Sequence, residues 1–133
     1  MNPKEIYQKE FELALSSNFV FENNPHIGLS ISGGPDSMAL FLLMKKCIKK
    51  LKGKISVFHF NHNLRSESGK EAEILENIVT NFRIDFYNIE WQHDGVVSKV
   101  METSRDERYK RIIELCEKMK IIHLYQFEHY TLQ

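Results

Sequence analysis

The run Ser32-Gly-Gly-Pro-Asp-Ser37 combines the residue types that bind phosphate groups. Gly33 and Gly34 can adopt positive φ angles and let an anion approach the backbone closely, and the two serines add hydroxyl donors. An apolar, strand-like stretch (27–32) leads into the run, and an apolar, helix-like stretch (38–44) follows it. Because the first amide groups of a helix are unpaired and its dipole is positive there, this order predicts an anion-binding loop. The alternative is an ordinary Gly-Pro turn.

A second polar segment follows the next strand-like stretch and contains His62 and Arg65. The forked guanidinium of Arg65 is suited to holding a phosphate group. Two alternatives stay open for these residues. Arg65 would instead form a surface ion pair with Glu67 or Glu71, and His62 would be a hydrogen-bonded loop histidine.

A third candidate group lies further along the chain, where Arg105 and Arg108 are three residues apart. A helix places two such residues on one face. Near the N-terminus of that helix they would face a nucleotide, and the alternative is a solvated arginine pair neutralised by neighbouring carboxylates. We favour a functional role for Arg105, leave both interpretations open for Arg108, and assign Tyr109 to core packing.

The elements that must position these residues alternate between helix and strand. This alternation predicts an α/β fold with a Rossmann-like parallel sheet of about four strands and helices on both faces. Ligands of such sheets bind at the carboxyl ends of the strands, where the first loop and His62 both lie. We expect the second helix to be buried all round at its start and to end at Gly53. The predicted helices are 3–16 (capped by Asn2, with Tyr7, Phe11 and Ala14 on one face), 36–51, 66 or 68 to 81, and 98–120; the predicted strands are 27–32, 55–60, 84–90 and 121–125.

The loop motif is not a Walker A loop, since no lysine follows its glycines. The G-x-G-x-x-G fingerprint of dinucleotide-binding folds is also absent. The loop motif resembles the PP-loop, S-G-G-x-D-S, of the ATP pyrophosphatases, which split ATP into AMP and pyrophosphate while adenylating a substrate. Residues 62–72 are similar to the pattern H-x-L-R-x-x-S-x-x-E-A, and residues 104–109 to A-R-x-x-R-Y, with Ser104 in place of alanine. Together the three motifs resemble the tRNA(Ile)-lysidine synthase family.

This resemblance implies a function and a set of site residues. The family uses ATP to adenylate the C2 oxygen of the wobble cytidine of tRNA(Ile), and free lysine then displaces AMP to give lysidine. It implies ATP and Mg²⁺ as cofactors, and tRNA(Ile) and lysine as partners. Asp36 and Arg105 are the implied catalytic residues, although Asp36, which would help to hold Mg²⁺, is alternatively a helix cap. The implied nucleotide-binding residues are Ser32, Gly33, Gly34, Pro35, Asp36, Ser37, His62 and Arg65.

The resemblance weakens at the C-terminal end. The family carries H-H-x-D-D-Q where this chain has residues 128–133, so that Thr131 and Leu132 replace the two aspartates. Neither replacement supplies a charged ligand for a hard cation. We therefore expect a truncated N-terminal portion of the enzyme, with residues 1–26 as a helix and turn, residues 27–133 as an incomplete nucleotide-binding domain, impaired catalysis, and an exposed edge on the fourth strand.

Composition limits the remaining possibilities. The formal net charge is zero, so no global field attracts nucleic acid. Cys47 and Cys116 fall on apolar helix faces and lack C-x-x-C spacing, which favours buried free thiols and argues against a tRNA thiolase. No signal peptide or membrane-spanning run is evident, so we expect a cytoplasmic protein, with monomer and homodimer both open. The alternative functions are a non-catalytic ATP-binding remnant and another PP-loop tRNA-modifying enzyme.

Overall fold

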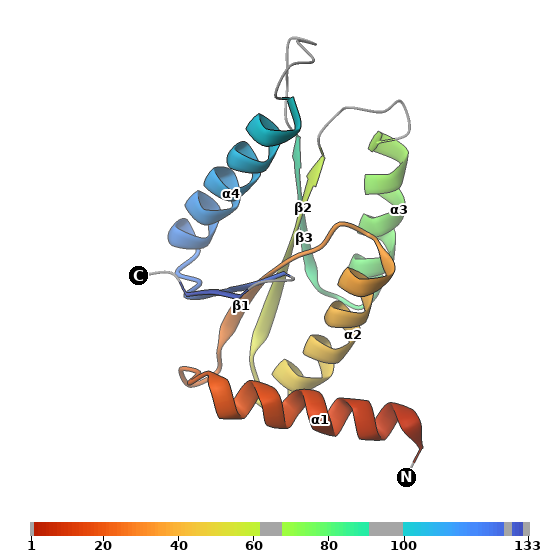
Figure 1. The fold of residues 1–133 in the computed structure, drawn as a ribbon, viewed down its shortest axis with the longest axis vertical. Coiled ribbons are helices and arrows are strands. Elements are labelled where there is room, and N and C mark those ends of the chain that lie inside the picture. Colours follow the sequence, from red (N-terminus) through yellow and green to blue (C-terminus); the bar gives the residue numbers. More distant parts are fainter. Residues whose placement is uncertain (1, 62–67, 91–99, 127–128, 132–133) are drawn as a thin grey trace.

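The computed structural model describes residues 2–61, 68–90, 100–126 and 129–131, and for residues 68, 100–105 and 129–131 it describes the backbone alone. Within these ranges, no helix is both long and apolar enough to cross a membrane. The elements of the described chain, shown in Figure 1, are α1 (Pro3–Asn18), β1 (His26–Ser30), α2 (Pro35–Lys50), β2 (Lys54–Asn61), α3 (Ser68–Asn81), β3 (Asp85–Glu90), α4 (Val100–Lys118), β4 (His123–Tyr125) and β5 (His129–Thr131).

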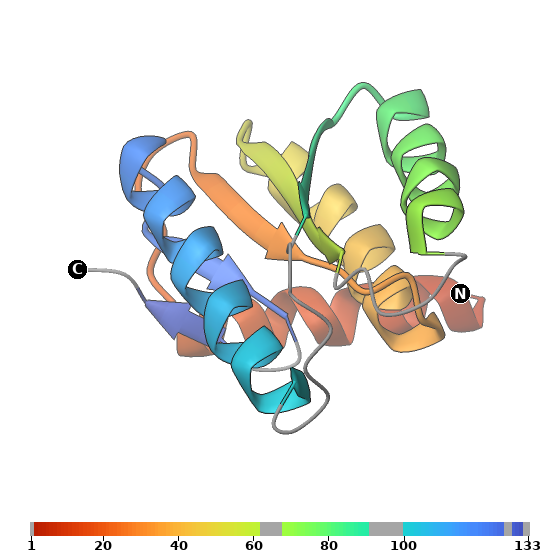
Figure 2. The same ribbon diagram turned by 90° about the horizontal axis from the view of Figure 1, so that it is seen from above.

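The strands form one sheet in the order β3-β2-β1-β4-β5. β1 pairs with β2 on one side and with β4 on the other, and all pairs among β1 to β4 are parallel, which confirms the predicted parallel sheet. After β3 the chain crosses to the opposite side of β1, so a switch point in strand order lies between β1 and β4. Figure 2 shows the sheet from above, with helices on either side. Switch points are where ligands bind in sheets of this kind.

The edge of β4 differs from the prediction. The sequence predicts an exposed edge there, and this prediction is wrong, because β5 pairs with β4 in the antiparallel direction, with His123 opposite Thr131 and Tyr125 opposite His129. A strand edge presents a row of unpaired N–H and C=O groups, and a neighbouring segment that can reach them gains backbone hydrogen bonds. Thr131, which aligns with one of the lost aspartates, therefore lies in a strand.

Helices cover both faces of the sheet, as predicted. On one face, α1, α2 and α3 pack on the odd-numbered side chains of β1, Ile27 and Leu29. On the other face, Cys116 and Ile112 of α4 pack on Phe58 and Leu124. Because successive side chains of a strand point to opposite faces, β2 supplies Val57 to one half of the core and Phe58 to the other, and β4 likewise supplies Tyr125 and Leu124.

α1 begins as predicted but buries a partly different face. Asn2 caps it by accepting from the Glu5 amide, and the Asn2 backbone N–H donates to Glu5 Oε2, so that both ends of a capping box are present. Of the predicted apolar face, Phe11 packs against the core, but Tyr7 is 63% exposed and Ala14 is also exposed, whereas Gln8 and Leu15 take the buried positions. Hydropathy did not indicate Gln8 because its side chain is polar.

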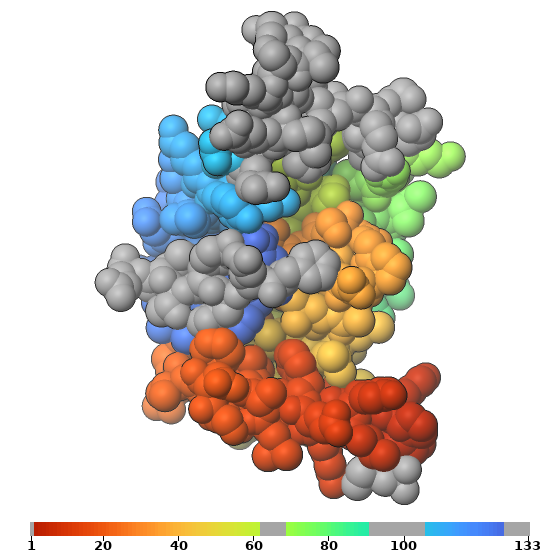
Figure 3. All heavy atoms as spheres, viewed as in Figure 1, coloured from red at the N-terminus to blue at the C-terminus, as the bar shows by residue number. Residues whose placement is uncertain are grey.

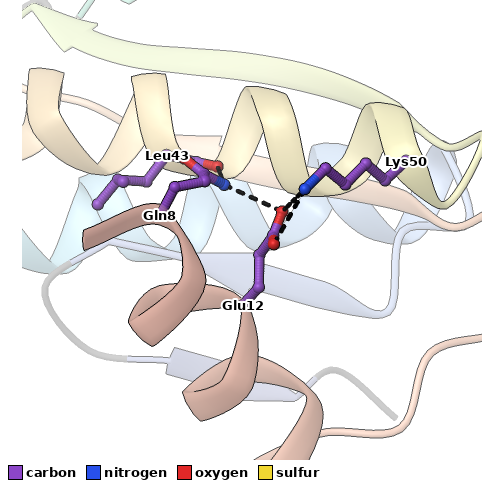
Figure 4. A network of polar contacts seen from close by, with 4 residues as sticks. All are labelled: Gln8, Glu12, Leu43 and Lys50. Carbon is purple, nitrogen blue, oxygen red and sulfur yellow. Dashed lines mark hydrogen bonds and ion pairs between the residues drawn. The ribbon is translucent and has the colours of Figure 1, made fainter. Parts of the chain in front are cut away.

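A polar network explains why Gln8 is buried (Figure 4). Its side-chain amide donates to the Leu43 carbonyl oxygen and to Glu12 Oε1, each at 3.2 Å. Glu12 also forms an ion pair with Lys50 Nζ at 2.9 Å. These contacts fasten α1 across α2, and in Figure 3 α1 (red) forms a ridge along one end of the molecule.

α2 also differs from its prediction. The apolar run in its first half is only partly buried, since Phe41 and Met44 are buried whereas Leu42 is 47% exposed. The residue that turns left-handed at its C-terminal end is Lys52, with a φ of 56°, rather than Gly53. Gly53 is needed for a different reason, because a Cβ atom at this position would clash with the carbonyl oxygen of Pro25.

Both cysteines are buried free thiols, as predicted. Burial, and then the nearby Glu117 carboxylate, raise the pKa of Cys116 to about 12, and burial likewise raises the pKa of Cys47. The thiolate is the reactive form of cysteine. We expect that an aromatic disulfide reagent such as DTNB labels neither thiol of the folded chain at pH 8 and labels both after denaturation. Rapid labelling in native buffer would contradict this packing.

Candidate nucleotide-binding site

Residues 32–37, here called the glycine loop, connect the carboxyl end of β1 to the N-terminus of α2. α2 begins at Pro35, which suits the first position of a helix because its missing N–H needs no partner there. Gly34 is the N-cap, and no side chain caps the helix. Gly33 has a φ of 93°, a conformation that side-chain-bearing residues rarely adopt. Positive φ was predicted to be accessible to both glycines of the loop, and Gly33 alone of the two adopts it, while Gly34 serves as the N-cap.

The hydroxyl of Ser37 organises the glycine loop. Its oxygen accepts from the amides of Ser32 and Gly33, each at 3.2 Å, and it donates to the Gly34 carbonyl oxygen at 3.1 Å. The Ser32 hydroxyl lies 3.2 Å from the Ser37 hydroxyl oxygen and accepts from the Gly34 amide at 3.3 Å. Ser37 is only 4% exposed, so its hydroxyl acts inside the loop, whereas Ser32 is exposed.

The loop still offers donors to an anion. The amides of Asp36 and Ser37 lie in the first turn of α2, where N–H groups have no intrahelical partner and the helix dipole is positive. The amides of Ser32, Gly33 and Gly34 are bonded to loop hydroxyls at 3.2–3.3 Å, the long end of the usual range. Charge-assisted bonds to phosphate oxygens are shorter and stronger, so a bound phosphate would compete for these amides.

A pocket of about 410 Å³ adjoins the loop. Ser32, Gly33 and Gly34 form one wall, and α3 forms the other with Glu71 and the apolar side chains of Ile74, Leu75 and Ile78. Its size falls in the range of small-molecule sites, and its mixture of an amide-rich wall and an apolar wall suits a nucleotide.

His59 lies near the end of β2 and forms a hydrogen bond to the segment that leads from β1 into the glycine loop. It was not predicted as a site residue from the sequence. Its Nδ1 lies 2.9 Å from the Ile31 carbonyl oxygen, which can only accept, so Nδ1 carries the proton. The Ile31 amide donates to the Phe58 carbonyl oxygen at 3.0 Å. Ile31 is thus held from both sides one residue before the loop. A half-buried histidine at the ligand-binding edge of the sheet was the available signal.

We expect that His59→Leu weakens ATP binding about 3- to 10-fold, because the Ile31 carbonyl oxygen loses its partner and the loop loses an anchor. His59→Asn should retain most of the affinity, since its side-chain amide can donate from nearly the same place. Calorimetric titration with ATP and Mg²⁺ measures both variants, alongside their thermal midpoints. Equal losses in the two variants would rule out this hydrogen bond as the cause.

Of the other predicted site residues, the structure describes only some, and these only in part. His62 and Arg65 lie outside the described residues. Arg105 is in the first turns of α4, and its side chain also lies outside the described part. Arg108 is half-buried rather than solvated, with its guanidinium carbon 4.8 Å from the centre of the Tyr109 ring. Its Nε is buried and has no hydrogen-bond partner among the described residues, which argues against the alternative of a solvated pair.

Comparison with known proteins identifies the family to which the chain belongs. A family model described as a PP-loop domain matches residues 3–130. The chain belongs to the PP-loop family. Its glycine loop lies at the position and in the conformation described above, at the carboxyl end of the central strand.

Among curated PP-loop relatives, the chain is similar to two tRNA(Ile)-lysidine synthases in particular. The one from Orientia tsutsugamushi (strain Boryong) is 37% identical over 109 residues, which cover 82% of this chain and 25% of that protein. The one from Rickettsia rickettsii (strain Sheila Smith) is 30% identical over 124 residues, which cover 93% and 26%. The chain thus spans about a quarter of the length of these relatives.

A solved structure shows the same fold. The chain superposes on the U34-tRNA thiolase NcsA from Methanococcus maripaludis, with its 4Fe-4S cluster, at a TM-score of 0.72. The match covers 91% of this chain and 44% of the thiolase, at 17% sequence identity. At this identity the likeness shows the PP-loop fold alone.

The carboxylates near the glycine loop fit a particular kind of magnesium binding. Asp36 is exposed in the first turn of α2, and because Gly34 is the N-cap, the alternative of Asp36 as a cap is wrong. Glu71 faces the adjoining pocket. No group of three or more His, Cys, Asp or Glu side chains among the described residues would hold a metal. Mg²⁺ is usually bound by one or two carboxylates together with water and substrate phosphates, so these residues fit a magnesium–nucleotide complex rather than a protein-only site.

Proposed function

We propose that this chain is the ATP-binding part of a tRNA(Ile)-lysidine synthase. The observation that carries the proposal is the glycine loop at the switch point of a PP-loop fold, held in one conformation by the Ser37 hydroxyl and followed by the unpaired first amides of α2. The similarity to lysidine synthases over most of this chain supports the choice of reaction.

In the proposed reaction the C2 oxygen of the wobble cytidine attacks the α-phosphorus of ATP, and pyrophosphate leaves. The glycine loop would bind the leaving pyrophosphate, with the first amides of α2 and the helix dipole stabilising the negative charge that develops on it. Magnesium, when bound with the nucleotide, neutralises part of that charge. The lysine amine then attacks C2, and AMP departs.

The residues of this chain are better suited to binding ATP than to catalysing the formation of lysidine. Thr131 and Leu132 replace the two aspartates of the family motif, and the chain spans about a quarter of its relatives. Arg105 and Asp36 are proposed to act on the phosphates, and His62 and Arg65 to lie near the nucleotide. We therefore propose that the chain alone binds ATP and Mg²⁺ in the cytoplasm and forms little or no lysidine.

The positions of the cysteines disfavour a thiolase as the alternative. Cys47 lies in the core on one face of the sheet and Cys116 in the core on the opposite face. Two thiols separated by a sheet cannot hold one cluster or one persulfide pair. A non-catalytic ATP-binding module remains the second candidate, supported by the replaced aspartates.

Calorimetric titration with ATP and Mg²⁺, followed by a pyrophosphate-release assay with tRNA(Ile) and lysine, tests the proposal. We expect saturable ATP binding and no pyrophosphate release that depends on tRNA(Ile). Because pyrophosphate leaves before lysine attacks, release that requires tRNA(Ile) and that added lysine sustains over several turnovers would show that the chain alone is a competent synthase and would overturn the proposed impairment. No ATP binding at millimolar concentration would overturn the function itself.

A further inference from the structure

A groove of about 710 Å³ lies at the end of the sheet opposite the glycine loop. It is formed where α2 and α3 end and where β2 and β3 begin. Five cationic side chains line it, with a single carboxylate, Asp85. The cations are Lys45, Lys49, Lys52, Lys54 and Arg83. We call this the basic groove, and it lies outside the proposed nucleotide site.

Most of this charge is not neutralised within the described part of the chain. Asp85 forms an ion pair with Lys54 at 3.1 Å. Lys49, Lys52 and Arg83 form no ion pair with any described residue. Burial, and then the charge of Lys54, lower the pKa of the neighbouring His26, so that this histidine is neutral at pH 7. Because the whole chain has a net charge of zero, the basic groove is a local concentration of cations and does not reflect a basic composition.

Two of these cations occupy backbone positions that normally favour glycine. Lys52 and Arg83 have φ angles of 56° and 61° and follow the ends of α2 and α3. A left-handed conformation is unfavourable for a residue that carries a side chain, because its Cβ atom crowds the following carbonyl oxygen. Cations near a helix C-terminus do stabilise the helix dipole, which accounts for part of this pattern. The dipole does not account for Lys54, which begins a strand.

The groove also contains an aromatic side chain. Phe82 is 43% exposed, and Lys45 Nζ lies 4.5 Å from the centre of its ring. Exposed aromatic rings among lysines and arginines are the usual means of binding single-stranded nucleic acid, since the cations bind phosphates and the ring stacks on a base. The Phe82 ring also packs against Phe41, with ring centres 5.9 Å apart, and the exposed remainder of the ring is the part that a base can contact. An acidic peptide would use the cations but would gain nothing from this exposed aromatic surface.

We propose that the basic groove binds a short single-stranded segment of RNA, with phosphates on Lys49, Lys52 and Arg83 and a base against Phe82. The groove lies at the opposite sheet end from the glycine loop, so an RNA segment held there leaves the nucleotide site open. The inference does not depend on lysidine formation.

Fluorescence anisotropy with a labelled single-stranded 12-mer RNA of mixed sequence tests the proposal. The variant Lys49→Gln/Arg83→Gln removes two groove cations, and Lys4→Gln/Lys9→Gln removes two exposed lysines of α1 as the matched control. The groove variant should bind at least tenfold more weakly at 50 mM salt, and its salt slope should be shallower by about 1.4, which is the value for two lost phosphate contacts on a single strand. The control should lose no more than about threefold, and circular dichroism should show both folded.

Two further measurements make the proposal specific. Phe82→Leu, checked for its thermal midpoint, should weaken RNA binding about fivefold or more, whereas poly-glutamate of the same charge should compete poorly. Ser37→Ala should leave RNA binding unchanged, which separates this groove from the nucleotide site. Equal losses in groove and control variants, effective competition by poly-glutamate, or no RNA binding at 50 mM salt would each overturn the proposal.

Discussion

Ser37→Ala should weaken ATP binding by on the order of 10- to 100-fold. The Ser37 hydroxyl joins the amides of Ser32 and Gly33 to the carbonyl oxygen of Gly34, so its loss removes the contacts that hold the loop in one conformation. Each hydrogen bond contributes about 0.5–1.5 kcal/mol, and about 1.4 kcal/mol corresponds to tenfold in affinity. Calorimetric titration with ATP and Mg²⁺ measures the change.

The control for this prediction is Ser17→Ala, which removes an exposed serine hydroxyl from α1. It should bind ATP as the unmodified chain does. Thermal unfolding of both variants separates loss of binding from loss of folding. If Ser37→Ala remains folded and binds ATP with unchanged affinity, the Ser37 hydroxyl does not shape the site.

Gly28→Val should lower the free energy of unfolding by about 2–3 kcal/mol. Gly28 lies in β1 on the face that α4 covers, and a Cβ atom there would approach Phe58 Cε2 at 3.0 Å, Leu124 Cδ1 at 3.2 Å and Cys116 Sγ at 3.3 Å. The valine methyl groups would add further overlap in a close-packed core. Domains of this size have about 5–15 kcal/mol in total, so a large fraction of the stability would be lost.

Urea unfolding followed by circular dichroism measures this effect. Gly69→Ala is the matched control, because a Cβ atom at Gly69 in α3 meets nothing within 4 Å. The control should change the free energy of unfolding by no more than about 0.5 kcal/mol. A Gly28→Val variant as stable as the control would mean that α4 does not pack on β1 as described.

Much of the fold could be predicted because its signals are local. The alternation of apolar stretches with glycine, proline and asparagine predicted the helices and the parallel strands, and most element ends agree to within one or two residues. The glycine loop was predictable because positive φ, helix start and strand end all depend on adjacent residues.

The features that the sequence did not predict depend on contacts between residues that are distant in the chain. Gln8 is buried because it reaches Leu43 on another helix, and His59 matters because it reaches Ile31 across a strand pair. Hydropathy alone ranks both as surface residues. β5 was not predicted because three residues are too few to show an alternating pattern, although Tyr130 and Thr131 are common strand residues, and its pairing is set by the edge of β4 that lies beside it. Lys52 takes the left-handed turn, and Gly53 is needed where the chain passes close to Pro25, a contact between segments that the local sequence does not show.

The central claim is that the glycine loop binds the phosphates of ATP. Titration of the ¹⁵N-labelled chain with ATP and Mg²⁺ tests it directly, because NMR resolves by residue the two anion sites proposed above, the glycine loop and the basic groove. We predict that the amide resonances of Gly33, Gly34 and Ser37 shift together and saturate, and that pyrophosphate shifts the same set. The account would be contradicted if these resonances stay unmoved at millimolar ATP, or if only those of Lys52 and Arg83 in the basic groove respond.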